Sequence, residues 1–532
     1  MQGVPLLLFG LLVAIIVLTV IAKQLDTPYP VVFVIGGVLL AFVPNLPQVT
    51  LQPDLVFLIV LPPLLFSGGW STDWYEFKRN VRPIGFLAIG LVVASTLVIG
   101  AVAHSLIPAM TWPAAFALGA IVAPPDAVAA EAIFERLAVP RRIAAILSGE
   151  GLVNDASALV VLRFAVAAAV TGTFSLVHAF GAFVLVSVGG VAIGLLVAFA
   201  IEGVQRLLAR GELTDSLLSN VVLLLAPYAA YLPAEGVHVS GVLAVVTAGI
   251  YLSRRSARVA DSQTRLVGSA VWNMLVLLLN GAVFISIGLQ LRGLIATLSG
   301  NPWRIGLDAV VVCVSVILVR ILWVIPATYL PRILFKRVRD RDPSPSWRSV
   351  AVIAWSGMRG IVSLAAALAL PFTVAGGAPF PARSEVIFIT FCVIFATLVL
   401  QGFSLGPIIA WLGISETSAR ERQETKVRIR ALEAGLAKLH DLESTFESTK
   451  DWEAAGRLLG EYEHRIDHLR GHLDGDSDAS AGNAVDHRLQ REALDAERRA
   501  IMRMRGAGEI PDAIFRNIEY DLDLADVRLA TS

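Results

Sequence analysis

The sequence predicts an all-α membrane protein with about thirteen transmembrane helices and a helical cytoplasmic tail. Of its 532 residues, 56% are hydrophobic and 16% are charged, whereas soluble globular chains carry roughly 25% charged residues. The charges concentrate after residue 413, and the part before it is a series of apolar stretches. We therefore expect a transmembrane domain at 1–413 and a cytoplasmic tail at 414–532.

Each apolar stretch is long enough to cross a bilayer as a helix of about 20 residues. The longer stretches must tilt, break or protrude. The expected spans cover residues 4–22, 28–44, 51–67, 83–108, 112–135, 141–172, 174–206, 214–232, 237–253, 265–291, 303–330, 347–374 and 383–412.

Basic residues alternate between the loops and therefore orient the spans, because cytoplasmic loops carry an excess of Lys and Arg. The N-terminus is expected outside and the tail in the cytoplasm of a multi-pass cell-membrane protein. The basic loops hold Lys23, Arg79, Arg142, Arg206, Arg255 and Arg337, and the opposite loops hold only Arg292, Arg304 and Arg383.

Composition excludes several other classes of function. The 43 basic and 43 acidic residues balance, so nothing favours a nucleic-acid partner. Cys313 and Cys392 both lie in apolar spans and are expected to be small core residues. We find no glycine-rich phosphate-binding motif, and Asp155 and Ser157 have no neighbouring histidine base. We therefore expect no cofactor and no enzymatic activity.

Charged and helix-breaking residues inside the spans carry the functional signal. Asp155 lies in the middle of the sixth span, where a charge is costly and typical of ion or proton pathways. The fifth span holds Pro124, Pro125 and Asp126, and two prolines in mid-span break a helix beside a carboxylate. In the twelfth span, Arg359 lies between two glycines, which indicates a second break.

Counted from the expected cytoplasmic ends, these groups lie about nine to fourteen residues deep at 1.5 Å per residue. Glu150 is at the same depth as Arg320 of the eleventh span, and a buried carboxylate needs a cation. We expect a structural ion pair between them, which leaves Asp155 to exchange its charge partner. Broken helices in two separate halves indicate inverted repeats, here spans four to six and eleven to thirteen.

Four motifs resemble the monovalent cation/proton antiporter family, which includes bacterial NhaP-type antiporters and animal sodium/proton exchangers. Arg320 corresponds to the arginine that pairs with the sixth-span glutamate in that family. The resemblance covers about residues 1–413. The other three motifs are Ala123-Pro124-Pro125-Asp126-Ala127-Val128, Ser148-Gly149-Glu150-Gly151-Leu152-Val153-Asn154-Asp155 and Gly357-Met358-Arg359-Gly360.

The resemblance implies a homodimer in which Asp155 binds either Na⁺ or H⁺ and Asn154 holds Asp126 and the helix break in place. Asn before Asp resembles the electroneutral, one-for-one branch. Gly151 departs from the family pattern, which often has a serine after the glutamate, so water or a backbone oxygen must replace that hydroxyl. Cation selectivity therefore stays open at this point.

These residues suggest a mechanism. Hard cations prefer oxygen ligands, and the carboxylates of Asp155 and Asp126, the carbonyl of Pro124 or Pro125, and water would bind Na⁺. Burial favours a protonated carboxyl group and a bound cation favours the charged form, so proton and cation compete. We expect Na⁺ or Li⁺ exchange for H⁺ by alternating access, serving pH homeostasis. The alternatives are a K⁺/H⁺ antiporter, a cation channel and a non-transporting sensor.

The tail combines dense charge with an apolar stripe of helical spacing, so we expect about four helices and a disordered link at 475–482. The region 510–529 resembles the tail end of bacterial members of the family. His464, His468 and His472 share one helix face. A solvated face is the simpler interpretation, and metal or pH sensing is the alternative.

Overall fold

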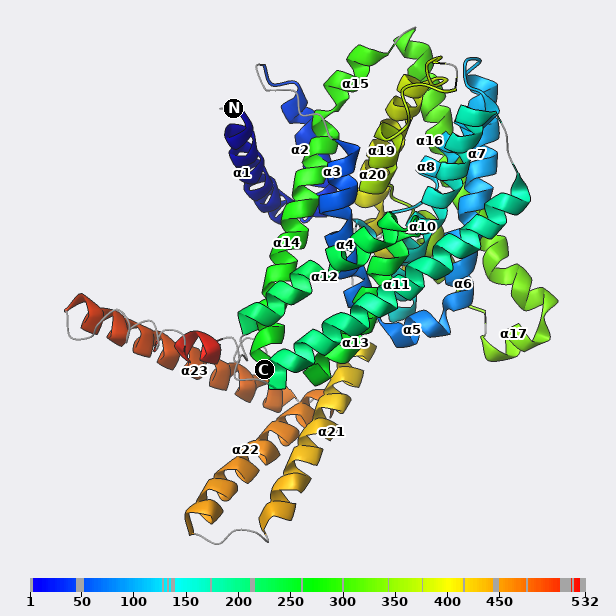
Figure 1. The fold of residues 1–532 in the computed structure, drawn as a ribbon. Helices are drawn as coiled ribbons and strands as arrows, with labels where there is room; N and C mark the ends of the chain where they lie inside the picture. The colour runs from blue at the N-terminus through cyan, green and yellow to red at the C-terminus, as the bar shows by residue number, and fades with distance from the viewer. Residues whose placement is uncertain are drawn as a thin grey trace. The chain divides into compact units, whose positions relative to one another are not determined.

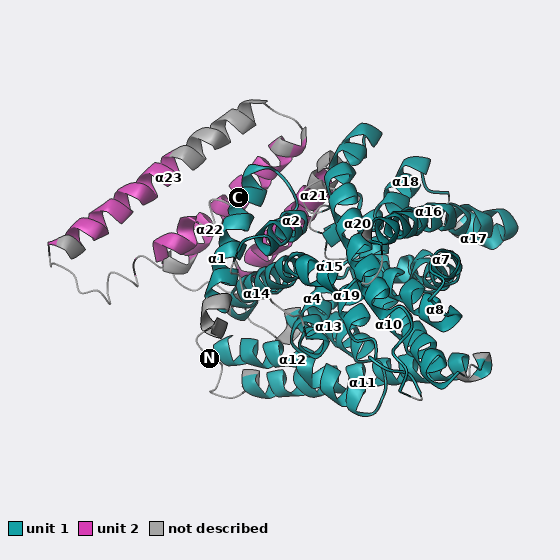
Figure 2. Ribbon diagram, turned by 90° about the horizontal axis from the view of Figure 1, so that it is seen from above, with its two compact units in different colours: residues 1–415 teal, residues 416–532 magenta. Residues whose placement is uncertain are grey.

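The computed structural model describes most of the chain and divides it into two compact units, residues 1–415 and 416–532 (Figures 1 and 2). Most helices are labelled in Figure 1, and α18 is labelled in Figure 2. The described residues are 3–44, 52–126, 129–131, 134, 139–172, 175–210, 216–259, 262–298, 301–342, 344–375, 377–414, 417–443, 449–474, 477–507, 518 and 521–526.

Helices form nearly all of the described first unit. Its first half comprises α1 (Gly3–Gln24), α2 (Tyr29–Ala41), α3 (Pro53–Leu55), the π-helical η1 (Val56–Val60), α4 (Leu61–Ser71), α5 (Trp74–Arg79), α6 (Val81–Gly85), the π-helical η2 (Phe86–Leu91), α7 (Val92–Leu106), α8 (Trp112–Val122) and α10 (Arg141–Thr171). Its second half comprises α11 (Leu176–Arg210), α12 (Ser216–Gly236), α13 (Gly241–Val259), α14 (Ser262–Leu289), α15 (Leu291–Thr297), α16 (Pro302–Leu334), α17 (Lys336–Arg341), α18 (Trp347–Trp355), α19 (Ile361–Leu368) and α20 (Arg383–Leu412).

The spans predicted from hydropathy correspond to these helices. Within the described residues, eight helical stretches are long and apolar enough to cross a membrane, and three shorter apolar helices accompany them. Helix α13 and the α18–α19 pair occupy two further predicted spans. The all-helical membrane fold is thus confirmed, while the count of thirteen stays a prediction.

Both predicted helix interruptions are present. Helix α8 ends at Val122 and the chain continues without helix to Asp126, while α18 ends at Trp355 and α19 begins only at Ile361. The two interruptions meet, because the Asp126 backbone N–H donates to the carbonyl oxygen of Met358 at 2.6 Å. Residues 127 and 128 of the predicted motif lie outside the described residues.

Local sequence explains where α18 begins. Ser346 is its N-cap, and its hydroxyl accepts a hydrogen bond from the Ser349 backbone N–H at 3.2 Å. Such a cap satisfies one of the donors that the first helical turn leaves without a partner. Nine residues later the helix ends at the glycine-containing segment 356–360, so a short helix delivers that segment to the protein interior.

Glycines bring several helices of the first unit into close contact. A Cβ at Gly288 of α14 would collide with the backbone of α2 around Val34 and Val38. On α11, Gly194 meets the backbone of α13 at Ala244 in the same way. In lipid no hydrophobic effect drives helices together, and small residues allow the close packing that holds them. These contacts are therefore typical of a membrane domain.

The second unit consists of α21 (Thr417–Glu443), α22 (Thr449–Asp474) and α23 (Ser477–Gly506), with further helix at 521–526. Helices α21 and α22 pack together, and Arg470 pairs with Glu433 at 2.7 Å. The helical tail is as predicted.

The disordered link predicted at 475–482 is wrong for residues 477–482, which begin α23. Alanines at 479 and 481 favour helix by intrinsic propensity, and residues 475 and 476 of the predicted link lie outside the described residues. The prediction of a link gave more weight to Gly475 and Gly482 than to these helix-favouring alanines.

Candidate functional site

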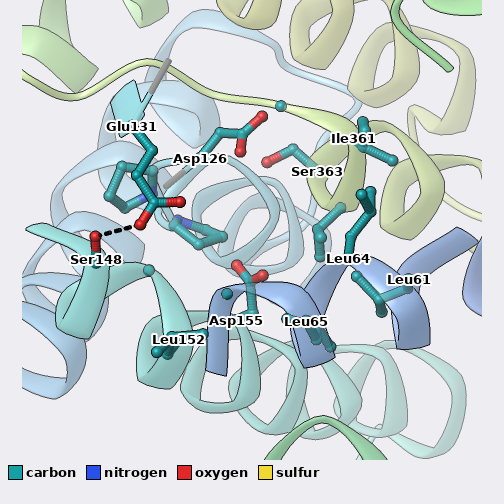
Figure 3. Close-up of a pocket in the computed structure, with 16 residues that line it drawn as sticks. Leu61, Leu64, Leu65, Asp126, Glu131, Ser148, Leu152, Asp155, Ile361 and Ser363 are labelled. Atoms are coloured by element: carbon teal, nitrogen blue, oxygen red, sulfur yellow. Dashed lines mark hydrogen bonds between the residues drawn. The ribbon is translucent and has the colours of Figure 1, made fainter. Parts of the chain in front are cut away.

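A cavity of about 60 Å³ lies where α4, α10 and the two helix interruptions meet. A cavity must offer roughly 10–15 Å³ to hold one water, so this cavity has room for more than one water-sized molecule. Figure 3 shows the carboxyl groups of Asp126 and Asp155 directed into it from opposite walls. The polar lining also includes Glu131, Ser148 and Ser363, and leucines of α4 form an apolar wall.

Adjacent residues of α10 serve different surroundings, because neighbours on a helix lie about 100° apart. Asp155 lines the cavity and remains partly accessible, whereas Asn154 is fully buried. The Asn154 side-chain amide donates to the Pro125 carbonyl oxygen at 3.3 Å. Asn154 thus contacts the interrupted helix, and Asp155 faces the cavity beside it.

Glu150 and Arg320 form a bidentate ion pair, with nitrogen–oxygen distances of 2.5 and 2.9 Å. Both side chains are completely buried. The same guanidinium donates to the carbonyl oxygen of Ile353 at 3.2 and 3.3 Å. Arg320 therefore joins α16 to α10 and to the end of α18, and its charge is matched where water is excluded.

Arg359 lies at the C-terminal end of α8. Its guanidinium donates to the carbonyl oxygen of Val122 at 3.0 Å and to that of Ala123 at 3.5 Å, and a further nitrogen donates to Gly357. The last carbonyls of a helix lack partners within the helix and carry partial negative charge. The buried Arg359 supplies both the missing donors and an opposing charge.

The two glycines beside Arg359 leave room for charged side chains. A Cβ at Gly360 would overlap the carboxyl group of Asp126. At Gly357 a Cβ would lie 2.5 Å from Cδ of Arg320 and 2.7 Å from the Arg359 guanidinium. The second interruption therefore passes close to the charged groups because it carries no side chains at these two positions.

The structure brings together the predicted residues Asp155, Asp126 and Pro125 at the cavity. Asn154 is hydrogen-bonded to Pro125, and Glu150, Arg320 and Arg359 make their contacts outside the cavity lining. Sequence reasoning missed a role for Glu131 and Ser148. A weak signal existed, since Ser148, Leu152 and Asp155 are spaced i, i+4, i+7 and share one face of α10. Glu131 carried no such signal.

A second missed feature is the cluster around Asp342, which precedes α18. Its carboxylate pairs with Arg82 of α6 at 2.8 Å, with Arg142 of α10 at 2.6 Å and with Arg332 of α16 at 2.6 Å. One acidic residue therefore joins the ends of three helices that are far apart in sequence.

Crossed helix interruptions beside a carboxylate-lined cavity define the class of this protein as a secondary transporter for small cations. The model of the family "Sodium/hydrogen exchanger, transmembrane" matches residues 11–411. The chain belongs to this family, as its motifs predicted, and is a Na⁺/H⁺ antiporter rather than a member of an enzyme family.

Curated relatives match most of the chain. A protein of Mycobacterium tuberculosis described as an uncharacterized Na⁺/H⁺ exchanger is 33% identical, with 98% of this chain and 97% of that protein covered. A sodium, potassium, lithium and rubidium/H⁺ antiporter of Bacillus subtilis is also 33% identical, covering 94% of this chain and 75% of that protein. The Na⁺/H⁺ antiporter ApNhaP of Aphanothece halophytica is 32% identical, covering 78% and 75%.

The fold resembles that of a solved structure. The sodium proton antiporter MjNhaP1 from Methanocaldococcus jannaschii, determined at pH 8, superposes with a TM-score of 0.60 at 20% identity. The match covers 76% of this chain and 99% of that chain. At this identity the likeness concerns the fold, which is the one predicted.

Proposed function

We propose that Asp155 is the exchange site, where one Na⁺ or Li⁺ and one proton bind alternately and cross the membrane in opposite directions. The observation that carries the proposal is the contrast among the buried charges. Glu150 and Arg320 neutralise each other, and Arg359 is engaged by helix carbonyls. Asp155, in contrast, faces a cavity with room for an ion and water.

The proposed cation ligands are all oxygens, as a hard cation requires. Carboxylate oxygens of Asp155 and Asp126 and water supply most of them. The Pro125 carbonyl accepts one hydrogen bond from Asn154 and has a second lone pair for the ion. Asn154 would hold this carbonyl and the interruption in position without itself binding the cargo.

Competition between the two cargoes follows from the surroundings of Asp155. The apolar wall of the cavity favours the protonated carboxyl group when no cation is present, and a bound cation favours the carboxylate. If the site crosses the membrane only when it holds one or the other, exchange is one-for-one and electroneutral. Na⁺ and H⁺ are then cargo, and no cofactor takes part.

Alternating access requires α10 and the interrupted helices to move against the remaining helices. We propose that two groups of predicted spans form the moving part. Spans four to six are residues 83–108, 112–135 and 141–172, and spans eleven to thirteen are residues 303–330, 347–374 and 383–412. An ion pair joins the moving part to the remaining helices, since Arg163 of α10 pairs with Glu235 of α12 at 2.9 Å. Movement of α10 would have to break or rearrange this pair.

The surroundings of the protein complete the proposal. We propose a homodimer in the cell membrane, with the N-terminus outside and the charge-dense tail in the cytoplasm. The unevenly distributed loop charges support this orientation. Residues 1–413 would carry transport, with 414–532 as an attached cytoplasmic tail, and the exchange would serve pH homeostasis.

K⁺/H⁺ exchange is the second candidate. Gly151 lines the cavity but offers no side-chain oxygen as a ligand. With fewer fixed oxygen ligands, the site discriminates less strictly between Na⁺ and K⁺. The B. subtilis relative is named for potassium and rubidium as well as sodium and lithium. A cation channel differs from both antiporters because it needs no proton in return.

Cation-driven proton movement in sealed, acidified vesicles tests the proposal. Na⁺, Li⁺ and K⁺ are added in turn to wild type and to Asp155→Asn while a dye reports internal pH. Recovery with wild type alone, and with Na⁺ or Li⁺ preferred, is the expected result. Equal recovery with K⁺ favours the second candidate. Recovery that survives Asp155→Asn removes Asp155 as the site.

A further inference from the structure

Glu131 is a third carboxylate in the cavity, beside the proposed exchange site. It lines the same space as Asp126 and Asp155, and Figure 3 shows the three acidic groups around one opening. The Ser148 hydroxyl donates to Oε1 of Glu131 at 2.8 Å. This hydrogen bond orients the carboxylate group of Glu131 at the wall of the cavity.

The position of this pair along α10 gives it a direction. Ser148 precedes Asp155 by seven residues, which is about 10 Å along a helix. It lies toward the Arg141 end, which the loop charges assign to the cytoplasm. Since i and i+7 share a helix face, a cation moving from that side toward Asp155 passes the Ser148–Glu131 pair first.

The three carboxylates do not form one compact cluster. Among the described residues, no three His, Cys, Asp or Glu side chains are grouped closely enough to hold a single metal ion. Glu131 is held against Ser148, seven residues before Asp155 on α10. Gly151, one turn from Ser148 on the same face, adds no side chain between the two positions.

We propose that Glu131, oriented by Ser148, attracts the cation into the cavity from the cytoplasmic side and thereby sets the affinity for the cation on that side. This inference rests on the exchange function proposed above and adds a residue that determines one-sided affinity. Glu131 is a positioning residue for the cargo, whereas Asp155 remains the group that exchanges it. A purely structural role for the pair, joining residue 131 to α10, predicts different kinetics.

Everted membrane vesicles expose the cytoplasmic face to the medium and measure the effect directly. For Glu131→Gln in the full chain, the KM for added Na⁺ is expected to rise about tenfold, with the maximal rate within twofold of wild type. Tenfold corresponds to about 1.4 kcal/mol, within the range for one charge acting at a few ångströms. Glu131→Asp keeps the charge and is expected to restore the KM to within about twofold.

Right-side-out vesicles provide the matched control. There the KM for external Na⁺ is expected to be the same in Glu131→Gln and wild type, because Glu131 lies on the other side of Asp155. An unchanged KM in everted vesicles overturns the proposal. So does a loss of maximal rate from both sides without a change in KM, which is the mark of a structural role.

Wild type and Asp155→Asn separate the two levels of inference. If wild type shows no cation-dependent proton movement, the exchange function itself is wrong. If wild type exchanges and Asp155→Asn does not, the exchange function stands, and the KM of Glu131→Gln alone decides the role of Glu131. Ser148→Ala, which removes only the orienting hydrogen bond, is expected to raise the everted-vesicle KM about two- to threefold, a smaller change than the loss of charge.

Discussion

Arg320, Arg359 and Asp155 have different surroundings, and these surroundings define their different roles. Arg320 is matched by Glu150 with two hydrogen bonds, and Arg359 is matched by carbonyls at the end of α8. Asp155 faces the cavity instead. A charge held by fixed protein groups stabilises structure, whereas a charge facing a hydrated space can exchange its partner.

The buried ion pair gives a prediction for stability. Replacing Arg320 by Gln leaves Glu150 charged and buried, which is expected to destabilise the protein by about 3–5 kcal/mol. Arg163→Gln is the matched control, because Arg163 is 54% exposed and such pairs contribute about 0–1 kcal/mol. Thermal unfolding in detergent measures both. A similar unfolding temperature for the two variants would contradict the structural role of the buried pair.

At the residue scale, sequence predicts the groups that lipid should reject and misses those that only the fold brings together. Asp155, Glu150 and Arg320 are conspicuous because a charge inside an apolar span is costly. Asp342 lies in a charged loop where such residues are common, and its three arginines come from separate parts of the chain. Glu131 became a candidate only through its place in the cavity.

At the element scale, the two interrupted helices depend on each other. The Asp126 N–H donates to Met358 in one direction, and Arg359 donates to Val122 in the other. Each interruption thus satisfies polar backbone groups that the other exposes, which non-helical backbone at membrane depth requires. Prolines at 124 and 125 and glycines at 357 and 360 made both breaks predictable, but the crossing between them required the structure.

Gly360 tests this dependence. Gly360→Ala places a Cβ against the Asp126 carboxyl group, so Asp126 or the segment must shift, and exchange is expected to fall at least tenfold. Gly203→Ala on α11 is the control, because nothing lies within 4 Å of that Cβ and alanine favours helix. Exchange rates are compared at equal amounts of folded protein. Full activity of Gly360→Ala would show that close packing at Asp126 is unnecessary.

Movement of α10 against α12 gives another prediction at this scale. Cysteines replacing Arg163 and Glu235, in a chain without Cys313 and Cys392, are close enough for a short cross-linker. Cross-linking is expected to stop exchange, since α10 can then no longer move, and cleavage of the linker is expected to restore it. The same double variant without cross-linker is the control. Undiminished exchange after complete cross-linking would exclude the proposed relative movement.

At the scale of the whole molecule, the apolar spans and the charge-dense tail form separate compact units. The polar site, its ion pair and both interruptions lie entirely within residues 1–415. The sequence predicts a domain boundary at residue 413, because apolar and charged stretches differ sharply on either side of it. The exact number of spans was harder to predict, because short and broken helices carry weak hydropathy signals.

The division predicts the outcome of truncation. A chain ending at residue 415 is expected to enter the membrane and retain Asp155-dependent exchange, because the buried contacts of the site lie within the first unit. The rate per folded molecule in vesicles is the measurement, with the full chain beside it. Loss of exchange in a well-folded truncated chain would give the tail a direct part in transport.

Proton release on cation binding tests most directly that cation and proton share one carboxylate. Na⁺ is added to purified full-length protein in weakly buffered detergent solution at a pH where exchange occurs, with choline as the control cation, and the pH change is recorded. Up to one proton per bound Na⁺ is expected to be released from wild type and none from Asp155→Asn. Na⁺ binding without proton release in wild type, or equal release from Asp155→Asn, would contradict a shared carboxylate.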